Sequence, residues 1–208
     1  MQVFNKDAAK KTFVYTWYLY PIGIILTIIL LLWGFGSFHQ PTNHQKINIF
    51  IGAQVTNQKY EKLIKEKYDR EKLREIKTNS IHPSNDLYYD KLLLYLSDSD
   101  LLILPKDTFE GFRNQYQNYF FPISQEMKDE YLSSSYTYYS DFDDGLTYGI
   151  LLKSNAVSTW LSEYMTFIEG DYYLAFSTSS KNLGKYMEAE NEYYDNALTI
   201  VKYIMEGV

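Results

Sequence analysis

The hydrophobic pattern of this chain opens with a run from Thr12 to Gln45 that contains no charged side chain. The hydrocarbon core of a bilayer is about 30 Å thick and needs roughly 20 apolar residues in a helix. The stretch from about Val14 to Phe38 meets that need. The pattern therefore predicts one transmembrane helix. The predicted parts of the chain are a tail over 1–12, the helix over 13–38, a linker over 39–46 and a water-facing domain over 47–208.

Lysine residues orient the predicted span. Lys6, Lys10 and Lys11 precede it, whereas only Lys46 lies at a comparable distance after it. Positive residues near a span favour the cytoplasmic side, so we expect a cytoplasmic N-terminus and an extracytoplasmic domain on a bacterial cell membrane. The apolar run is longer than a signal-peptide core, and no A-x-A cleavage pattern follows it. An uncleaved anchor is therefore favoured over a cleaved signal peptide.

Beyond the linker, segments with strand periodicity alternate with segments of helical periodicity up to about residue 120. Residues 47–55 alternate apolar and polar side chains, whereas Tyr60, Leu63 and Ile64 lie on one apolar helical face. The predicted elements are a strand over 47–55, a helix over 60–68, a strand over 73–77, a helix over 87–96, a strand over 101–104 and a helix from 107. Such alternation favours a parallel sheet.

The second half of the chain favours strands joined by turns. We expect strands over 136–139, 147–152 and 172–178, and a short helix within 156–167. Apolar residues at helical spacing predict a C-terminal helix, with Tyr193, Ala197, Ile200, Val201 and Ile204 on one face. The predicted fold class is α/β, with one N-terminal transmembrane helix and a mixed, mainly parallel sheet flanked by helices.

Composition narrows the functional classes. The chain has no cysteine, which excludes disulfides, thiolate metal sites and cysteine nucleophiles. Three of the 20 basic and one of the 26 acidic residues precede the predicted span, which leaves a net charge of −8 for the rest. An acidic domain is a poor candidate for binding nucleic acid. The 22 tyrosines allow a binding surface, but they are spread along the domain, so half-buried structural positions are favoured.

No catalytic or metal-binding constellation stands out. The chain lacks a G-x-S-x-G elbow, a P-loop and a G-x-G-x-x-G loop, so we expect neither an enzyme nor a cofactor. The acidic group Asp141, Asp143, Asp144 and Gly145 breaks the spacing of a calcium loop, and a solvated turn is favoured. The three histidines, His39, His44 and His82, lack the further ligands of a zinc site.

Polar residues gather where the predicted parallel strands end. Ligands of open α/β sheets bind at the carboxyl ends of the strands. The candidate binding residues there are Gln54, Thr56, Asn57, Thr78, Asn79, Ser80, His82, Lys106, Asp107 and Thr108. They have the groups needed to hydrogen-bond a ligand or a partner loop. They are equally suited to cap helices and close turns, and the sequence leaves both alternatives open.

The order of these features resembles the extracellular solute-binding proteins of bacterial ABC transporters, over most of residues 46–206. The segments that carry the resemblance are Asp100–Pro105 with Phe109, Tyr148–Leu152, Tyr172–Ser177 and Asn196–Val201. The resemblance implies a fold like one lobe of a type 2 periplasmic-binding protein. Leu151 stands where the family has a hinge proline, and too few residues are present for a second lobe. A single-lobe, membrane-anchored relative is therefore expected.

The predicted function is a membrane-anchored, non-catalytic binding module outside the cytoplasm. It would meet the lipid bilayer through residues 13–38, and its domain would contact a membrane-protein partner such as an ABC transporter or another envelope complex. The alternative is a receptor for a small solute, a sugar or a peptide, whose cleft is completed by a second copy or a partner. Nucleic acid is not an expected partner.

Overall fold

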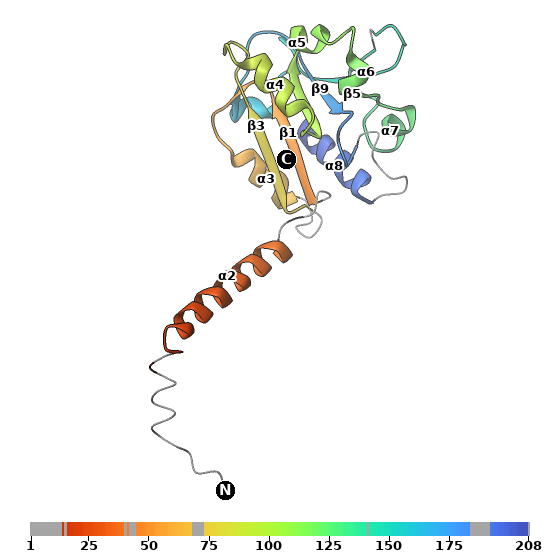
Figure 1. The fold of residues 1–208 in the computed structure, drawn as a ribbon. Coiled ribbons are helices and arrows are strands. Elements are labelled where there is room, and N and C mark those ends of the chain that lie inside the picture. The colour runs from red at the N-terminus through yellow and green to blue at the C-terminus, as the bar shows by residue number, and fades with distance from the viewer. Residues whose placement is uncertain are drawn as a thin grey trace. The chain divides into compact units, whose positions relative to one another are not determined.

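The computed structural model describes residues 14, 16–39, 41, 45–67, 73–140, 142–183 and 192–207, with side chains described in all of these except 36–39 and 192–196. The chain divides into two units, Met1–Gln40 and Pro41–Val208. The first unit contains one long helix, and the second is an α/β domain (Figure 1).

Helix α2 (Leu19–His39) contains no charged residue. Its large aliphatic side chains from Ile22 to Leu32 are each 50–69% exposed, and the hydroxyl of Thr27 donates to the carbonyl oxygen of Gly23 at 2.8 Å. Within the described residues, no helix is both long enough and apolar enough to cross a membrane. The structure thus gives no support to the span predicted over 13–38, although a helix occupies most of that range.

The domain is built on a seven-stranded sheet in the order β3-β1-β4-β9-β7-β6, with β5 also paired to β9. The strands are β1 (Lys46–Ile51), β3 (Glu75–Ser80), β4 (Leu101–Pro105), β5 (Phe120–Phe121), β6 (Tyr138–Tyr139), β7 (Gly149–Lys153) and β9 (Tyr172–Ser177). A separate two-stranded ladder joins β2 (Gln54–Val55) to β8 (Met165–Thr166).

The sheet is mixed, as predicted, but only its first three strands are parallel. Strand β1 pairs in parallel with β3 on one side and with β4 on the other. Strand β9 is antiparallel to each of its partners, β4, β5 and β7. The prediction of a mainly parallel sheet is therefore wrong for the second half, where short connections such as the β6–β7 hairpin impose antiparallel pairing.

The helices are α3 (Lys59–Lys67), α4 (Tyr88–Leu96), α5 (Lys106–Gly111), α6 (Tyr116–Tyr119), α7 (Gln125–Glu130), the 3-10 helix η2 (Trp160–Glu163) and α8 (Glu192–Glu206). The predicted helices at 60–68 and 87–96 are confirmed as α3 and α4. The helix predicted from 107 breaks after Gly111, a residue that weakens helices, and resumes as α6.

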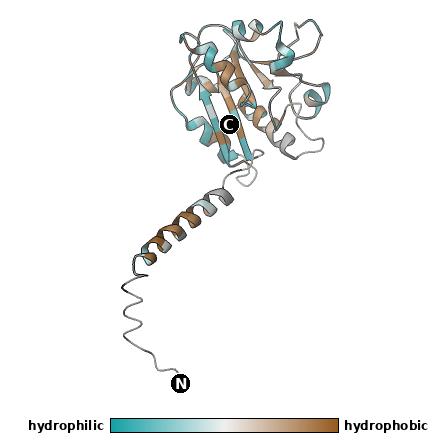
Figure 2. Cartoon of the chain, viewed as in Figure 1, coloured by the Kyte–Doolittle hydropathy of each residue, from teal (hydrophilic) through white to brown (hydrophobic). Residues whose placement is uncertain are grey.

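Side chains of successive strand residues point to opposite faces of the sheet and fill two cores. In β1, Ile47, Ile49 and Ile51 belong to one core, whereas Phe50 belongs to the other. Side chains of α3, α7 and α8 complete the first core, and those of α4, α5 and α6 complete the second. The domain therefore has three layers, with the apolar residues concentrated in the central strands (Figure 2).

The strand predicted over 47–55 is interrupted at Gly52. The amide of Gly52 donates to the carbonyl oxygen of Ile103 at 2.8 Å, and the chain then leaves the sheet to form β2. The short helix predicted within 156–167 is present as the 3-10 helix η2. Met165 and Thr166, in the same range, form β8 because they pair with β2, about a hundred residues away.

The acidic turn joins β6 to β7. Gly145 has a φ of 69°, in the left-handed region that favours glycine. The carboxylate of Asp144 accepts hydrogen bonds from the Leu146 amide and from the Tyr148 hydroxyl, at 2.9 Å and 2.7 Å. The predicted hairpin turn is confirmed for the residues that are described, whereas Asp141 lies outside them.

Gly52 provides a test of how tightly the strands pack at this edge. A β-carbon at Gly52 would lie 2.7 Å from the Tyr88 hydroxyl and 2.9 Å from Cδ of Pro105. We expect Gly52→Ala to lower the free energy of unfolding by about 1–3 kcal/mol, as measured by urea denaturation followed by tryptophan fluorescence. Gly111→Ala is the matched control, because a β-carbon at Gly111 would have no such neighbour within 4 Å. Equal stability of the two variants would contradict this packing.

Candidate functional site

The first group of predicted binding residues serves the domain's own backbone. The amide and hydroxyl of Thr56 both donate to the carbonyl oxygen of Tyr164, each at 2.9 Å. The Asn57 amide donates to the same oxygen, and its side chain accepts from the Lys59 amide at the start of α3. Gln54 belongs to the ladder between β2 and β8. These residues hold the β2–α3 connection against η2 and β8.

The second group lies at and after the end of β3. The hydroxyl of Thr78 accepts from the Tyr60 hydroxyl at 2.5 Å, and burial raises the pKa of Tyr60. Ser80 is exposed at the last position of the strand. In the loop that follows, the ring nitrogen Nδ1 of His82 lies 2.6 Å from the hydroxyl of Ser84. The other two histidines, His39 and His44, lie where no side chain is described.

The third group follows β4. The Lys106 amide donates to the carbonyl oxygen of Asp171 at 2.9 Å, and its ammonium lies 3.8 Å from the Glu110 carboxylate. Asp107 is exposed, whereas Thr108 is buried. Most polar groups at this edge therefore serve turns, ladders and surface ion pairs. Of the two alternatives that the sequence left open, these contacts fit residues that cap helices and close turns better than residues that bind a ligand.

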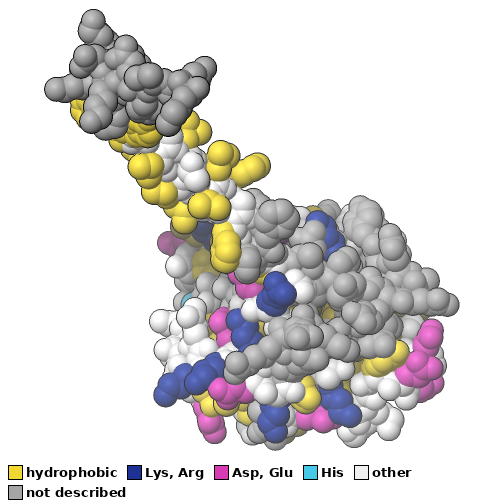
Figure 3. Space-filling model, turned by 90° about the horizontal axis from the view of Figure 1, so that it is seen from below, with side chains coloured by type: hydrophobic (Ala, Val, Ile, Leu, Met, Phe, Trp, Pro, Cys, Tyr) yellow, Lys and Arg dark blue, Asp and Glu magenta, His cyan; other side chains and the backbone are white. Residues whose placement is uncertain are grey.

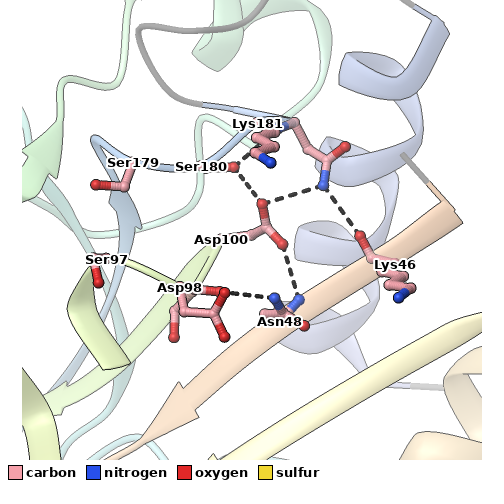
Figure 4. Close-up of a pocket in the computed structure, with 10 residues that line it drawn as sticks. Lys46, Asn48, Ser97, Asp98, Asp100, Ser179, Ser180 and Lys181 are labelled. Carbon is pink, nitrogen blue, oxygen red and sulfur yellow. Dashed lines mark hydrogen bonds between the residues drawn. The ribbon is translucent and has the colours of Figure 1, made fainter. Parts of the chain in front are cut away.

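A polar pocket lies at the opposite edge of the parallel strands, where β1 and β4 begin (Figure 4). Its volume is about 80 Å³, and its walls come from three separate segments of the chain. The lining residues are Lys46, Asn48, Ser97, Asp98, Ser99, Asp100, Ser179, Ser180, Lys181 and Asn182. None of them belongs to the binding set predicted from the sequence.

Asp100 is the centre of this pocket, and only 6% of its surface is exposed. Its Oδ2 accepts from the Asn48 amide at 2.9 Å. Its Oδ1 accepts from the Ser180 hydroxyl at 2.5 Å and from the side-chain amide of Asn182 at 3.1 Å. Among the described residues, no lysine or arginine forms an ion pair with this carboxylate. Burial raises the pKa of Asp100, against the lowering effect of the hydrogen bonds from Asn48, Ser180 and Asn182.

The loop after β9 is tied to the strands by the same network. The hydroxyl of Ser180 accepts from the amides of Asn182 and Leu183, and the side-chain amide of Asn182 also donates to the carbonyl oxygen of Lys46 at 3.1 Å. Two buried oxygen atoms, Oγ of Ser99 and Oδ1 of Asn182, have no hydrogen-bond partner within the described structure. Such atoms are costly unless a bound species satisfies them.

The sequence signal for this pocket was the position of Asp100. Strand β4 is buried along its whole length. An aspartate that directly precedes such a strand must lie in the core or at its edge. We used Asp100 only as the first residue of the segment Asp100–Pro105 that carries the resemblance, and did not predict it as a site residue. The carboxylate accepts hydrogen bonds from Ser180 and Asn182, which lie about 80 residues further along the chain. No local sequence pattern connects these two residues to Asp100.

The outer face of α4 is the second notable surface. Leu87, Tyr89, Leu93 and Leu94 are each 52–61% exposed, whereas Tyr88, Leu92 and Leu96 fill the core beneath. Exposed Asp90 and Lys91 lie on the same helix. Elsewhere, on the domain face shown in Figure 3, charges of both signs are interspersed rather than gathered into one patch.

No family model, curated protein or solved structure that was compared with this chain matches it. The resemblance to solute-binding proteins therefore stays a prediction.

The raised pKa of Asp100 predicts an unusual pH dependence. Over the range between its ordinary value, about 3.9, and its raised value, the folded state holds a proton that the unfolded state has lost. The contribution of Asp100 to the free energy of unfolding is therefore greatest below about pH 4, and it decreases as the pH rises through that range. The measurement is urea denaturation of the wild type and of Asp100→Asn from pH 4 to pH 8. We expect the unfolding free energy of the wild type minus that of the variant to fall as the pH rises. A difference that grows with pH would contradict the raised pKa.

Proposed function

We propose that this protein is a membrane-anchored, non-catalytic binding module, with its N-terminus in the cytoplasm and its α/β domain outside a bacterial cell membrane. The domain binds a membrane-protein partner through the outer face of α4. The observation that carries this proposal is the set of large apolar side chains exposed on that helix and at its N-cap, Leu87, Tyr89, Leu93 and Leu94.

The α4 face has the chemistry of a protein interface. Large apolar and aromatic side chains form the centre of such interfaces, and charged residues form their rims. On α4, the leucines and Tyr89 supply the apolar surface, while Asp90 and Lys91 supply charge of both signs. The opposite side of the helix is fixed by Tyr88, Leu92 and Leu96 in the core. A rigid helix presents these groups without the cost of ordering a loop.

The membrane anchor is supported by the sequence. The run from Thr12 to Gln45 has no charge, and Lys6, Lys10 and Lys11 precede it. The aliphatic side chains of α2 are exposed over the described part of the helix, and lipid is the cover that suits an uncharged helical surface. Anchoring raises the effective concentration of the domain toward partners in the same membrane.

A receptor for a sugar or peptide is less well supported. Small-molecule pockets commonly have volumes of about 300–1,000 Å³, whereas the polar pocket at Asp100 measures about 80 Å³. Thr56, Asn57 and Thr78 at the other edge already hydrogen-bond within the domain. A receptor that used either end of the parallel strands would therefore need a second copy or a partner to complete its cleft.

The kinship with one lobe of a type 2 solute-binding protein is part of the same proposal. The segments that carry the resemblance include β4, β7 and β9, and these three strands lie next to one another in the sheet. An ABC transporter is accordingly the first membrane partner to examine, and another envelope complex is the second.

The α4 face can be tested by site-specific photocrosslinking in native membranes. We expect p-benzoylphenylalanine at position 94 to capture an integral membrane protein, and the same residue at position 157, also exposed, to capture it far less. The double variant Leu93→Gln, Leu94→Gln should lose this partner, while its unfolding free energy stays within about 0.5 kcal/mol of the wild type. A partner retained by the double variant would contradict the proposal. Stabilisation by a sugar or peptide that is independent of α4 would favour the receptor instead.

The anchor and its orientation can be tested by cysteine labelling, because the chain has no cysteine of its own. In intact cells, a membrane-impermeant maleimide should label Ala156→Cys in the exposed part of the domain. It should label Ala8→Cys only after permeabilisation. The protein should also stay with the membranes after extraction at alkaline pH. The reverse labelling pattern would contradict the orientation, and release into the supernatant would contradict the anchor.

A further inference from the structure

We propose that strand β3 pairs antiparallel with β3 of a second copy of this chain, about a two-fold axis, so that one sheet runs through both domains. This inference goes beyond the function proposed for α4 and does not depend on it, because it concerns the edge of the sheet.

Strand β3 is the outermost strand of the sheet, next to β1 (Figure 1). It is six residues long, and all six are in register with β1. Within the described residues, no segment pairs with the other side of β3. An edge of this kind presents a row of unpaired backbone amide and carbonyl groups, which is a template for another strand. The opposite end of the sheet offers a shorter template, because β6 has only two residues.

The side chains of β3 divide between the two faces of the sheet. Ile76 is buried in the core that α3 completes, and Thr78 accepts a hydrogen bond from Tyr60 of α3. Because successive strand residues point to opposite faces, Glu75 and Lys77 share the other face. Their side chains are 44% and 52% exposed, so both are accessible to a neighbouring chain.

The charges on this face favour one register of the paired strands. If Ile76 lies opposite Ile76 of the second copy, each Glu75 lies opposite a Lys77, and the two-fold axis makes this contact twice. Directly opposite residues of antiparallel strands have β-carbons about 4.5–5.5 Å apart, and opposite charges there are stabilising. A register centred on Glu75 or on Lys77 would instead place like charges opposite each other, which is destabilising.

The contacts that these two residues make within one chain are compatible with this pairing. The Lys46 ammonium lies 3.6 Å from the Glu75 carboxylate, and the Lys77 ammonium lies 3.9 Å from the Asp98 carboxylate. In the paired sheet, Glu75 and the opposing Lys77 join these contacts into a row of alternating charge. Charged side chains commonly discourage pairing at a sheet edge, whereas this self-complementary pattern favours it.

The symmetry of the pair limits it to two copies. The two-fold axis between antiparallel strands of one sheet runs perpendicular to that sheet, so α4 lies on the same side in both copies. Two copies that are anchored in one membrane meet in this way when the sheet lies along the membrane surface. Because each chain uses the same edge strand, the contact closes on itself and does not grow into a filament.

The first test is sedimentation equilibrium of the full-length protein in a mild detergent. We expect the wild type to dimerise, and Glu75→Lys and Lys77→Glu each to weaken dimerisation by about tenfold, because each variant opposes like charges twice. An equimolar mixture of the two variants should dimerise as the wild type does, because a lysine then opposes a glutamate at both contacts. Lys202→Glu, exposed on α8, is the matched control and should leave dimerisation unchanged.

Disulfide formation tests the register, because the chain has no cysteine of its own. We expect a mixture of Glu75→Cys and Lys77→Cys to give a disulfide-linked dimer under mild oxidation. Either variant alone should not, because identical positions of the two copies would be about 7–8 Å apart in this register, beyond the span of a disulfide.

Three results would overturn the proposal. The first is a wild type that stays monomeric and gives no mixed disulfide. The second is a dimer that both charge variants retain at full strength, which would place the contact on another surface. The third is a mixture of the charge variants that associates as weakly as each variant alone. These results are separate from the test of α4, because the double variant Leu93→Gln, Leu94→Gln should leave dimerisation unchanged.

Discussion

The domain depends on one buried carboxylate that joins three distant segments of the chain. Asp100 directly precedes β4, accepts a hydrogen bond from the backbone of β1 through Asn48, and accepts two more from Ser180 and Asn182 after β9. Its own amide donates to the carbonyl oxygen of Asn48, and its carbonyl oxygen accepts from Ser177. The carboxylate thus aligns β1, β4 and β9 at one end. Its burial is costly and raises the pKa of Asp100, so the stability of this junction depends on pH.

Strand β1, which Asp100 holds at its start, contributes side chains to both cores. Its alternating side chains place Ile47, Ile49 and Ile51 against α3 and α8, and Phe50 against α4. The start of the strand is fixed by hydrogen bonds to Asp100. Its carboxyl end is closely packed, because the neighbours of Gly52 leave no space for a β-carbon. Strand β1 is therefore constrained by contacts at both of its ends. Helix α4 is held by this framework on one side and presents its leucines on the other.

This arrangement separates the proposed activities of the protein. In our proposal, the α4 face binds a protein partner and the uncharged run before the domain anchors it in the same membrane. The polar pocket, with a volume of about 80 Å³, is smaller than the pockets that commonly hold small molecules.

The sequence by itself determined the elements whose patterns are local. Helical spacing identified α3 and α4, and a continuous apolar run identified β4. Only the tertiary structure decided that β9 lies antiparallel between β4 and β7, and that the carbonyl oxygen of Tyr164 accepts from Thr56 and Asn57. It alone brought Ser180 and Asn182 to Asp100. The physical reason is range: side-chain periodicity records which face of an element is buried, whereas hydrogen bonds between segments about 80 to 110 residues apart leave no local pattern.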